Sequence, residues 1–389
     1  EEESSEEMES ESFSLDETSN TSHNTAFFLR TGAFVGIVFA LGFYFFHEQQ
    51  SFSTTEEPPS ARDVNIYFSP SLPEHSLFSF RAEDHNIRES SLALESVPFG
   101  EHKVSLTIDE LRCELYPDIL SIPEDSTPLS MNLKWKCPGL MGYRMRTIKG
   151  GEIRLGSDAR LPEHEEDELE THFFLDYDFE IGETEVTQEL WMALEEFNPS
   201  QNNDCLNCPV ENISWYDAIR FANRLSTAEH LQACYQVLGE EVRFLGVHCE
   251  GYRLPLEIEW EHAARGGRDF LYAGAQMPTS VAIFAFNSTQ RSAVGSSKRA
   301  NSFGLYDMSG NIAEWCQNDH QPYGEWPKVN PLSAETDLSS SAKILRGGSF
   351  LSEANELRVS HRNQEEPHKK DSSIGVRLVR SIPTSSENN

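Results

Sequence analysis

The sequence predicts a protein of the α+β class, in which a small β domain precedes a larger domain with little regular secondary structure. Short alternating stretches, separated by Pro, Gly and Asn, fill residues 63–145 and are typical of strands. Residues 187–267 contain three segments that predict helices, two by the apolar spacing of amphipathic helices and the third by Pro at its start and Gly at its end. Residues 268–380 are rich in glycine and hold only short apolar runs, which indicates loops and short strands.

The chain has 389 residues and a formal net charge of -33. Such a charge repels phosphate backbones, so we expect no nucleic-acid partner. A net -11 of this charge lies in residues 1–61, and we expect residues 1–25, which are acidic and rich in Ser, to be disordered. The chain as a whole has 38% apolar residues, enough for the bulk of it to bury a core, and the length of the chain favours two domains. Because the first residue is Glu1 and not Met, we expect a processed or truncated product.

Residues 26–46 predict one transmembrane helix. This stretch holds a single charge, Arg30, and none from Thr31 to Phe46. At about 1.5 Å of rise per residue it gives about 31 Å of helix, which is enough to cross a hydrocarbon core. The alternatives are a buried helix or the apolar part of a signal peptide. A signal peptide would begin with basic residues, whereas the 25 residues before this stretch are acidic.

The distribution of basic residues predicts the orientation of this helix. Arg30 lies near its N-terminal end, and no Lys or Arg follows until Arg62. Because positive charge favours the cytoplasmic side, we expect a single-pass membrane protein whose C-terminal body is exported, either periplasmic or extracellular. Residues 47–62 are polar, contain Pro and show no period, as expected of a linker.

The seven cysteines favour an oxidising compartment. Six of them form local pairs in the sequence: Cys113 with Cys137, Cys205 with Cys208, and Cys234 with Cys249. We expect three disulfides from these pairs and a free, buried thiol at Cys316. Cys205 and Cys208 could instead form half of a zinc site, but no second CxxC or HxxxH partner exists in the sequence.

The first strands are expected at VNIYF (64–68) and HKVSLTI (102–108). The longer stretch VPFGEHKVSLTI (97–108) is similar to the turn and strand of PEGA-type β modules, which often lie between a membrane helix and an exported domain. Residues 63–145 are therefore expected to form a small β domain.

Three helices are expected next. Thr187 caps the first, whose apolar face holds Leu190, Trp191, Leu194 and Phe197. Ser214 and Asp217 form a variant capping box before the second, whose apolar face holds Trp215, Ile219, Ala222 and Leu225. The third runs from Pro255 through Ala264 and ends at Gly266 and Gly267.

Six ordered blocks carry a resemblance to a known family. They are IGETEVTQELW (181–191), CPVENISWYDAIRFANRLS (208–226), GYRLPLEIEWEHAARGG (251–267), NSFGLYDMSGNIAEW (301–315), ILRGGSF (344–350) and RVSHRNQEEPHKKDSSIGVRLVR (358–380). Together they resemble the formylglycine-generating enzyme, or sulfatase-modifying factor, family over residues 146–382. The resemblance implies a compact α+β fold, a variant of the C-type lectin-like fold, followed by a disordered tail at 383–389.

Charged residues recur within these blocks. The set comprises Arg253, Glu257, Glu259, Glu261, Arg265, Arg346, Arg358, Arg362 and Arg377. Because Arg–carboxylate forks can fix loops that no sheet or helix fixes, we expect an internal ion-pair scaffold rather than substrate binding.

The resemblance implies an oxidase, but the residues of this chain depart from it. Active members oxidise a sulfatase cysteine to formylglycine with molecular oxygen, using copper held by two cysteines, and Cu(I) prefers such thiolates. Ser349 matches the active-site serine of the family, while the two copper positions correspond to Ser352 and Leu357. No cysteine follows Cys316, and Ala313 stands where many active members carry Trp. We therefore expect no copper and no catalysis at these positions.

The resemblance also implies a structural calcium ion. The matching positions are Asp307, Met308, Gly310, Ile312, Glu314 and Glu185. A glycine turn between two carboxylates can supply the several oxygens that a hard cation needs. The alternative is that Asp307 caps a turn and Glu314 pairs with an arginine.

The expected function is a membrane-anchored, exported protein whose family domain binds, scaffolds or senses a protein or envelope ligand without catalysis. The alternatives are a formylglycine-generating oxidase and a structural subunit of an envelope assembly. We expect the acidic run LPEHEEDELETH (161–172) to be surface and His361 to be a polar loop residue.

Overall fold

A computed structural model describes residues 61–69, 72, 76–87, 91–108, 111–124, 128–297, 299–331, 333–334, 336–338 and 341–382. The predicted acidic segment 1–25, membrane span 26–46 and tail 383–389 lie outside these residues, as does most of the predicted linker. The described residues all belong to one compact unit, Glu56–Asn389. Among them, no helix combines the length and the apolar character needed to cross a membrane.

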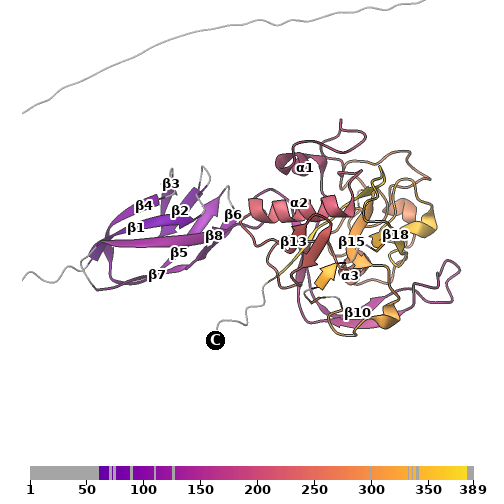
Figure 1. The fold of residues 1–389 in the computed structure, drawn as a ribbon, viewed down its shortest axis with the longest axis horizontal. Helices are drawn as coiled ribbons and strands as arrows, with labels where there is room; N and C mark the ends of the chain where they lie inside the picture. The colour runs from indigo at the N-terminus through magenta and orange to yellow at the C-terminus, as the bar shows by residue number, and fades with distance from the viewer. Residues whose placement is uncertain are drawn as a thin grey trace, which may run out of the picture. The chain divides into compact units, whose positions relative to one another are not determined.

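Eight strands between residues 61 and 136 form one sheet (Figure 1). They are β1 (Ala61–Ser69), β2 (Ser76–Phe80), β3 (Glu83–Ile87), β4 (Ser91–Pro98), β5 (Gly100–Ile108), β6 (Leu111–Tyr116), β7 (Ile119–Ile122) and β8 (Leu129–Lys136). The order is β3-β2-β5-β6-β8-β1-β4, with β7 also paired to β5. Strands β1 and β8 are parallel, and the other pairs are antiparallel. The stretches predicted as strands at 64–68 and 102–108 lie within β1 and β5, and β1 begins at the end of the predicted linker.

The core of this sheet follows from alternation along the strands. In β1, Val64, Ile66 and Phe68 are buried while their neighbours are partly or fully exposed. A period of two places these side chains on one face, where they join the apolar residues of the other strands in a single cluster. The disulfide Cys113–Cys137 links β6 to the residue that follows β8.

The three predicted helices are present. They are α1 (Gln188–Leu194), α2 (Trp215–Ala228) and α3 (Glu257–Arg265). The hydroxyl of Thr187 caps α1 by accepting a hydrogen bond from the Leu190 amide. Helix α1 ends at Leu194, so the expectation that Phe197 lies on its buried face is wrong, and that side chain is 68% exposed.

The ends of α2 and α3 follow from local chemistry. Ser214 and Asp217 form the expected capping box at the start of α2, in which each side chain accepts the backbone N–H of the other residue. Helix α3 begins two residues after Pro255 and ends where Gly266 adopts a φ of 58°. Glycine reaches this left-handed conformation without the steric cost that a Cβ would add, so the helix stops there.

The remaining strands are short and form four small sheets joined by long loops (Figure 1). They are β9 (Met145–Ile148), β10 (Gly151–Leu155), β11 (Thr171–Leu175), β12 (Phe179–Gly182), β13 (Tyr235–Leu238), β14 (Glu241–Phe244), β15 (Ala313–Asp319), β16 (Thr336–Leu338), β17 (Lys343–Arg346), β18 (Asn363–Glu365), β19 (Ile374–Gly375) and β20 (Val379–Ser381). The sheets are β10-β11, β20-β12-β9, β13-β14-β16 and β18-β17-β15-β19. Three single 3₁₀ turns, η1 (Pro278–Ser280), η2 (Tyr323–Glu325) and η3 (Ala354–Leu357), lie in the loops.

Buried ion pairs connect these loops, as the sequence predicts. The pairs are Arg253 with Glu259, Arg346 with Glu261, Arg358 with Glu168, Arg362 with Glu257 and Arg377 with Glu314. Their side chains are at most 1% exposed, so each charge depends on its partner and on further hydrogen bonds for its solvation.

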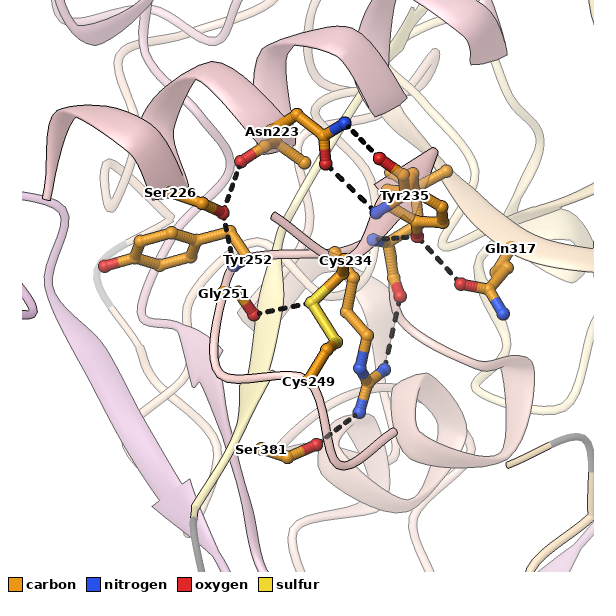
Figure 2. The surroundings of a disulfide bond; sticks show 12 residues. Asn223, Ser226, Cys234, Tyr235, Cys249, Gly251, Tyr252, Gln317 and Ser381 are labelled. Carbon is orange, nitrogen blue, oxygen red and sulfur yellow. Dashed lines mark hydrogen bonds between the residues drawn. A yellow bond between two sulfur atoms is a disulfide. The ribbon is translucent and has the colours of Figure 1, made fainter. Parts of the chain in front are cut away.

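Disulfides fix two more loops, and all three predicted cysteine pairs are bonded. Cys205–Cys208 closes the loop between α1 and α2. Cys234–Cys249 spans the β13-β14 hairpin, and Figure 2 shows the polar residues around it. The Asn223 side chain donates to the Tyr235 carbonyl and accepts from its amide, which ties the hairpin to α2.

Candidate functional site

The turn that matches the active-site serine of the resembled family lies after β17. Gly347 and Gly348 have φ values of 89° and 65°. A Cβ on Gly348 would lie 2.8 Å from the Glu356 carbonyl oxygen, so glycine is required there. Ser349 then folds back on Ser352: the Ser352 hydroxyl accepts from the Ser349 amide at 3.2 Å, and the Ser352 amide donates to the Ser349 carbonyl at 3.0 Å.

Leu357, which corresponds to the second copper position of the family, packs against apolar side chains. Leu357 ends η3 and is fully buried in a small cluster with Tyr272, Val281 and Phe284. A soft Cu(I) ion needs thiolates, and neither this side chain nor the Ser352 hydroxyl supplies one. The residues at both positions therefore do not fit copper.

Cys316 is the free cysteine, and it lies in a different part of the core. It belongs to β15, is fully buried, and packs in the main cluster rather than in the cluster of Leu357. Its carbonyl oxygen accepts the Trp215 indole N–H at 3.0 Å. Burial raises the pKa of the Cys316 thiol well above its ordinary value, which disfavours the thiolate that a metal or an oxidation would need.

A small polar pocket of about 120 Å³ lies beside the Ser349 turn. Its lining includes Ser349, Ser352, His361, Glu365, Lys369 and Asp371. Ala313 also lines it, so a small side chain stands where many active members of the resembled family carry Trp. With donors, acceptors and both signs of charge, this pocket can hold a small polar group.

The predicted calcium turn packs directly against this region. Asp307 and Asn311 have φ values of 57° and 64°, and Gly310 lies between them with its amide donating to the Gly347 carbonyl at 2.8 Å. A Cβ at Gly310 would lie 2.3 Å from the Ile283 carbonyl oxygen. Met308 and Ile312 are buried within the same turn.

Two buried carboxylates at this turn have oxygens without partners. Glu185 accepts the Asn311 side-chain N–H at 2.9 Å with one oxygen, while its Oε2 has no hydrogen-bond partner among the described residues. Asp307 accepts the Gly295 amide at 2.6 Å, while its Oδ1 lacks a partner in the same way. Burial, followed by the charge of Asp307, raises the pKa of Glu185 well above its ordinary value, and burial also raises the pKa of Asp307. A hard cation would satisfy both oxygens, so these two residues fit calcium.

Glu314 has a different partner. It accepts hydrogen bonds from the Arg377 guanidinium at 2.7 and 3.0 Å and from the Trp260 indole at 2.6 Å. The structure therefore places Glu314 with an arginine, which is one of the two alternatives that the sequence leaves open.

The expected surface run 161–172 is exposed or partly exposed except at Glu168 and Thr171, which are buried. Glu168 in this run is fully buried on Arg358, and its Oε1 lies 3.9 Å from the Nδ1 atom of His361. The residues that meet here are 190 or more positions apart in the chain, so no local pattern could have joined them.

Two known proteins are similar to this chain in sequence. The chain is 31% identical to the chaperone protein LppX of Paenibacillus barcinonensis over 238 residues, which cover 52% of this chain and 80% of that protein. It is 30% identical to the formylglycine-generating enzyme of Streptomyces coelicolor over 193 residues, which cover 44% of this chain and 52% of that enzyme. The chain thus spans about half the length of that enzyme.

One solved structure is similar to this chain in both sequence and fold. Treponema denticola variable protein 1 shares 31% sequence identity with a TM-score of 0.54, over 61% of this chain and 95% of that one. Residues 138–382 match the model of the sulfatase-modifying factor enzyme 1-like domain. Through these residues, the chain belongs to the family of sulfatase-modifying factor enzyme 1-like domains.

Proposed function

We propose that this domain binds a protein or envelope ligand and does not carry out the copper-dependent oxidation of active family members. The observation that carries the proposal is Leu357, which occupies the second copper position and is fully buried among apolar side chains. Ser352 at the first position uses its hydroxyl within the turn of Ser349. A copper ion has no thiolate ligand at either position.

The pocket beside Ser349 supports a binding role. Its lining is polar and charged, and the buried turns behind it are held by the Gly310–Gly347 hydrogen bond. A rigid polar pocket can recognise a small charged or hydroxyl-bearing group on a larger ligand.

Calcium is the metal that the domain is proposed to hold. Glu185 and Asp307 would supply carboxylate oxygens, and carbonyls of the turn 307–312 would supply others. The ion would balance two buried negative charges and fix the turn behind the pocket. Its role would be structural, since both carboxylates are buried.

The proposed location is a membrane anchor with an exported domain. The apolar stretch 26–46 and the three disulfides support it, since disulfides persist in oxidising compartments. A reporter that is active only outside the cytoplasm, fused after residue 60, is expected to be active. Activity of a cytoplasm-specific reporter at the same position would contradict this orientation.

The proposed loss of copper chemistry can be tested by metal binding. The full chain, purified in detergent, is titrated with Cu(I) against a chromogenic chelator, with an active family oxidase as positive control. No stoichiometric uptake is expected. Stoichiometric uptake that disappears in Cys316→Ser would contradict the proposal and indicate a relocated copper site.

A further inference from the structure

Three side chains at the edge of the Ser349 pocket have ligand atoms that lie close together. Glu165, Glu168 and His361 each bring one such atom within 4.8 Å of the other two. The two glutamates lie in the loop between β10 and β11, and His361 lies between η3 and β18. The Nδ1 atom of His361 is 3.3 Å from Glu165 Oε1 and 3.9 Å from Glu168 Oε1.

The Nδ1 atom of His361 lacks a hydrogen-bond partner among the described residues. The side chain of His361 is 12% exposed, and this nitrogen is buried. Buried polar atoms are normally hydrogen-bonded, so such an atom requires an explanation. Burial lowers the pKa of His361, and the positive charges of Arg358 and Arg346 lower it further, against the opposing effect of Glu165 and Glu168. A neutral ring can present a lone pair to a metal ion.

The distances allow the three atoms to surround one small ion after shifts of the side chains. Nitrogen and oxygen ligands lie about 2.0–2.1 Å from Zn²⁺, so two ligands of a tetrahedral site are about 3.4 Å apart. The separation of 3.3 Å between His361 and Glu165 meets this value, and the 3.9 Å separation from Glu168 needs only a small side-chain shift.

Glu168 is held in place by other residues. Its Oε2 accepts from Arg358 at 2.6 Å, Ser157 at 2.7 Å and Ser360 at 2.9 Å, whereas Oε1 accepts one bond from Arg358, at 2.7 Å. The oxygen that faces His361 therefore keeps acceptor capacity. Groups that orient a ligand in this way commonly surround metal sites.

The charges also fit a divalent cation. Arg358 lies against both carboxylates, bound to Glu168 at 2.6 Å and 3.8 Å from Glu165. The two carboxylates together carry one more negative charge than this arginine, and that charge remains to attract a metal. Arg346 lies near the ring, but its guanidinium is bound to Glu261 and to backbone carbonyls, including that of His361. The side chain of Glu165 is 42% exposed, which gives an ion a path from solvent.

We propose that Glu165, Glu168 and His361 bind one divalent transition-metal ion of the Zn²⁺ type, with a further coordination position open to solvent. An imidazole with two carboxylates suits zinc better than calcium, which takes oxygen ligands only. His361 also lines the pocket of Ser349 and Ser352, so the ion lies next to the proposed ligand pocket.

The test uses the full chain without a histidine tag, purified in detergent and saturated with calcium. ZnCl₂ is titrated at pH 7.5 against a chromogenic zinc chelator. One equivalent is expected to bind, and Glu165→Gln and His361→Asn are each expected to weaken it at least tenfold. Glu166→Gln, at an exposed neighbour in the same loop, serves as the matched control and is expected to leave the affinity unchanged.

Cobalt provides a second readout that does not depend on affinity. Co²⁺ bound at the site is expected to give visible absorption bands that change in intensity in Glu165→Gln. Both substitutions leave the Glu168–Arg358 pair intact, so far-ultraviolet circular dichroism is expected to match the unsubstituted protein. Absence of zinc binding, or equal affinity in all four proteins, would overturn the proposal and leave His361 as an ion-pair partner of Glu165.

Discussion

The guanidinium of Arg377 donates three hydrogen bonds to the carboxylate of Glu314, at distances of 2.7 to 3.0 Å. Neither side chain is more than 1% exposed. Arg377 also donates to the carbonyls of Gly182 and Tyr306. One side chain therefore joins β15, β12 and the residue that precedes the turn 307–312, and it neutralises a carboxylate that no solvent reaches.

Removing this arginine is expected to destabilise the domain strongly. Arg377→Ala leaves Glu314 buried without its counter-charge, and such changes cost about 3–5 kcal/mol. Denaturant unfolding measures the difference. Arg160→Ala is the control, because its side chain is 89% exposed and a surface change costs within about 0.5 kcal/mol. Equal losses for the two variants would contradict a structural role for the buried pair.

Calcium is expected to raise the melting temperature of the full chain. At a hundredfold excess of ion over its dissociation constant, binding to the folded state alone adds about 2.7 kcal/mol. Differential scanning fluorimetry with CaCl₂ or with a chelator measures the shift.

The calcium shift is expected to disappear in Asp307→Asn and in Glu185→Gln. Asn tolerates the left-handed backbone at position 307, so the first variant removes the charge without adding strain. Asp204→Asn, at an exposed residue, is expected to keep the shift. An identical melting temperature with and without calcium in the unsubstituted protein would rule out the site.

The capping box of α2 is expected to give a measurable pH dependence. Burial acts to raise the pKa of Asp217, but hydrogen bonds from Lys370, Ser214 and Arg220 outweigh it and lower the pKa below the ordinary 3.8. Because the pKa of Asp217 is lower in the folded state, its charge stabilises the fold fully at pH values above the ordinary pKa of 3.8. This stabilisation is lost as the pH falls through the lower folded-state pKa.

Asp217→Asn is therefore expected to lower stability by about 1 kcal/mol at neutral pH, in the range of capping interactions. The difference from the unsubstituted protein should shrink as the pH is lowered from 4 towards the folded-state pKa. Thermal unfolding at several pH values measures it. A difference that stays constant over this range would show that the charge of Asp217 has no part in it.

The two disulfides of the family domain are expected to contribute unequally. Cross-linking stabilises mainly by restricting the unfolded chain, and a loop of 15 residues gives about 3 kcal/mol. Replacing Cys234 and Cys249 by Ala should therefore cost more than replacing Cys205 and Cys208, which are three positions apart. Denaturant unfolding of the two double variants compares them, and a larger loss for the shorter loop would contradict the entropy argument.

Local patterns predicted the elements of this fold better than they predicted its contacts. The caps at Thr187 and Ser214 and the stop at Gly266 depend on neighbouring residues, and each is found where the sequence indicates. Phe197 was misplaced because apolar spacing alone does not show that α1 ends three residues earlier.

The contacts of the candidate sites arise from tertiary structure. Glu314 and Arg377 are 63 positions apart, and Glu168 and Arg358 are 190 positions apart. The sequence therefore shows which charged residues are present, but not which of them pair in the fold. The absence of cysteine at positions 352 and 357 was readable from the sequence, whereas the burial of Leu357 among apolar side chains required the structure.

The most direct test of the account is turnover of a sulfatase-type peptide. The full chain in detergent is incubated with Cu(I), oxygen and a CxPxR peptide, and mass spectrometry measures the conversion of its cysteine to formylglycine beside an active family oxidase. The account predicts that the peptide thiol remains unchanged above the protein-free control. Catalytic formation of the aldehyde would contradict it.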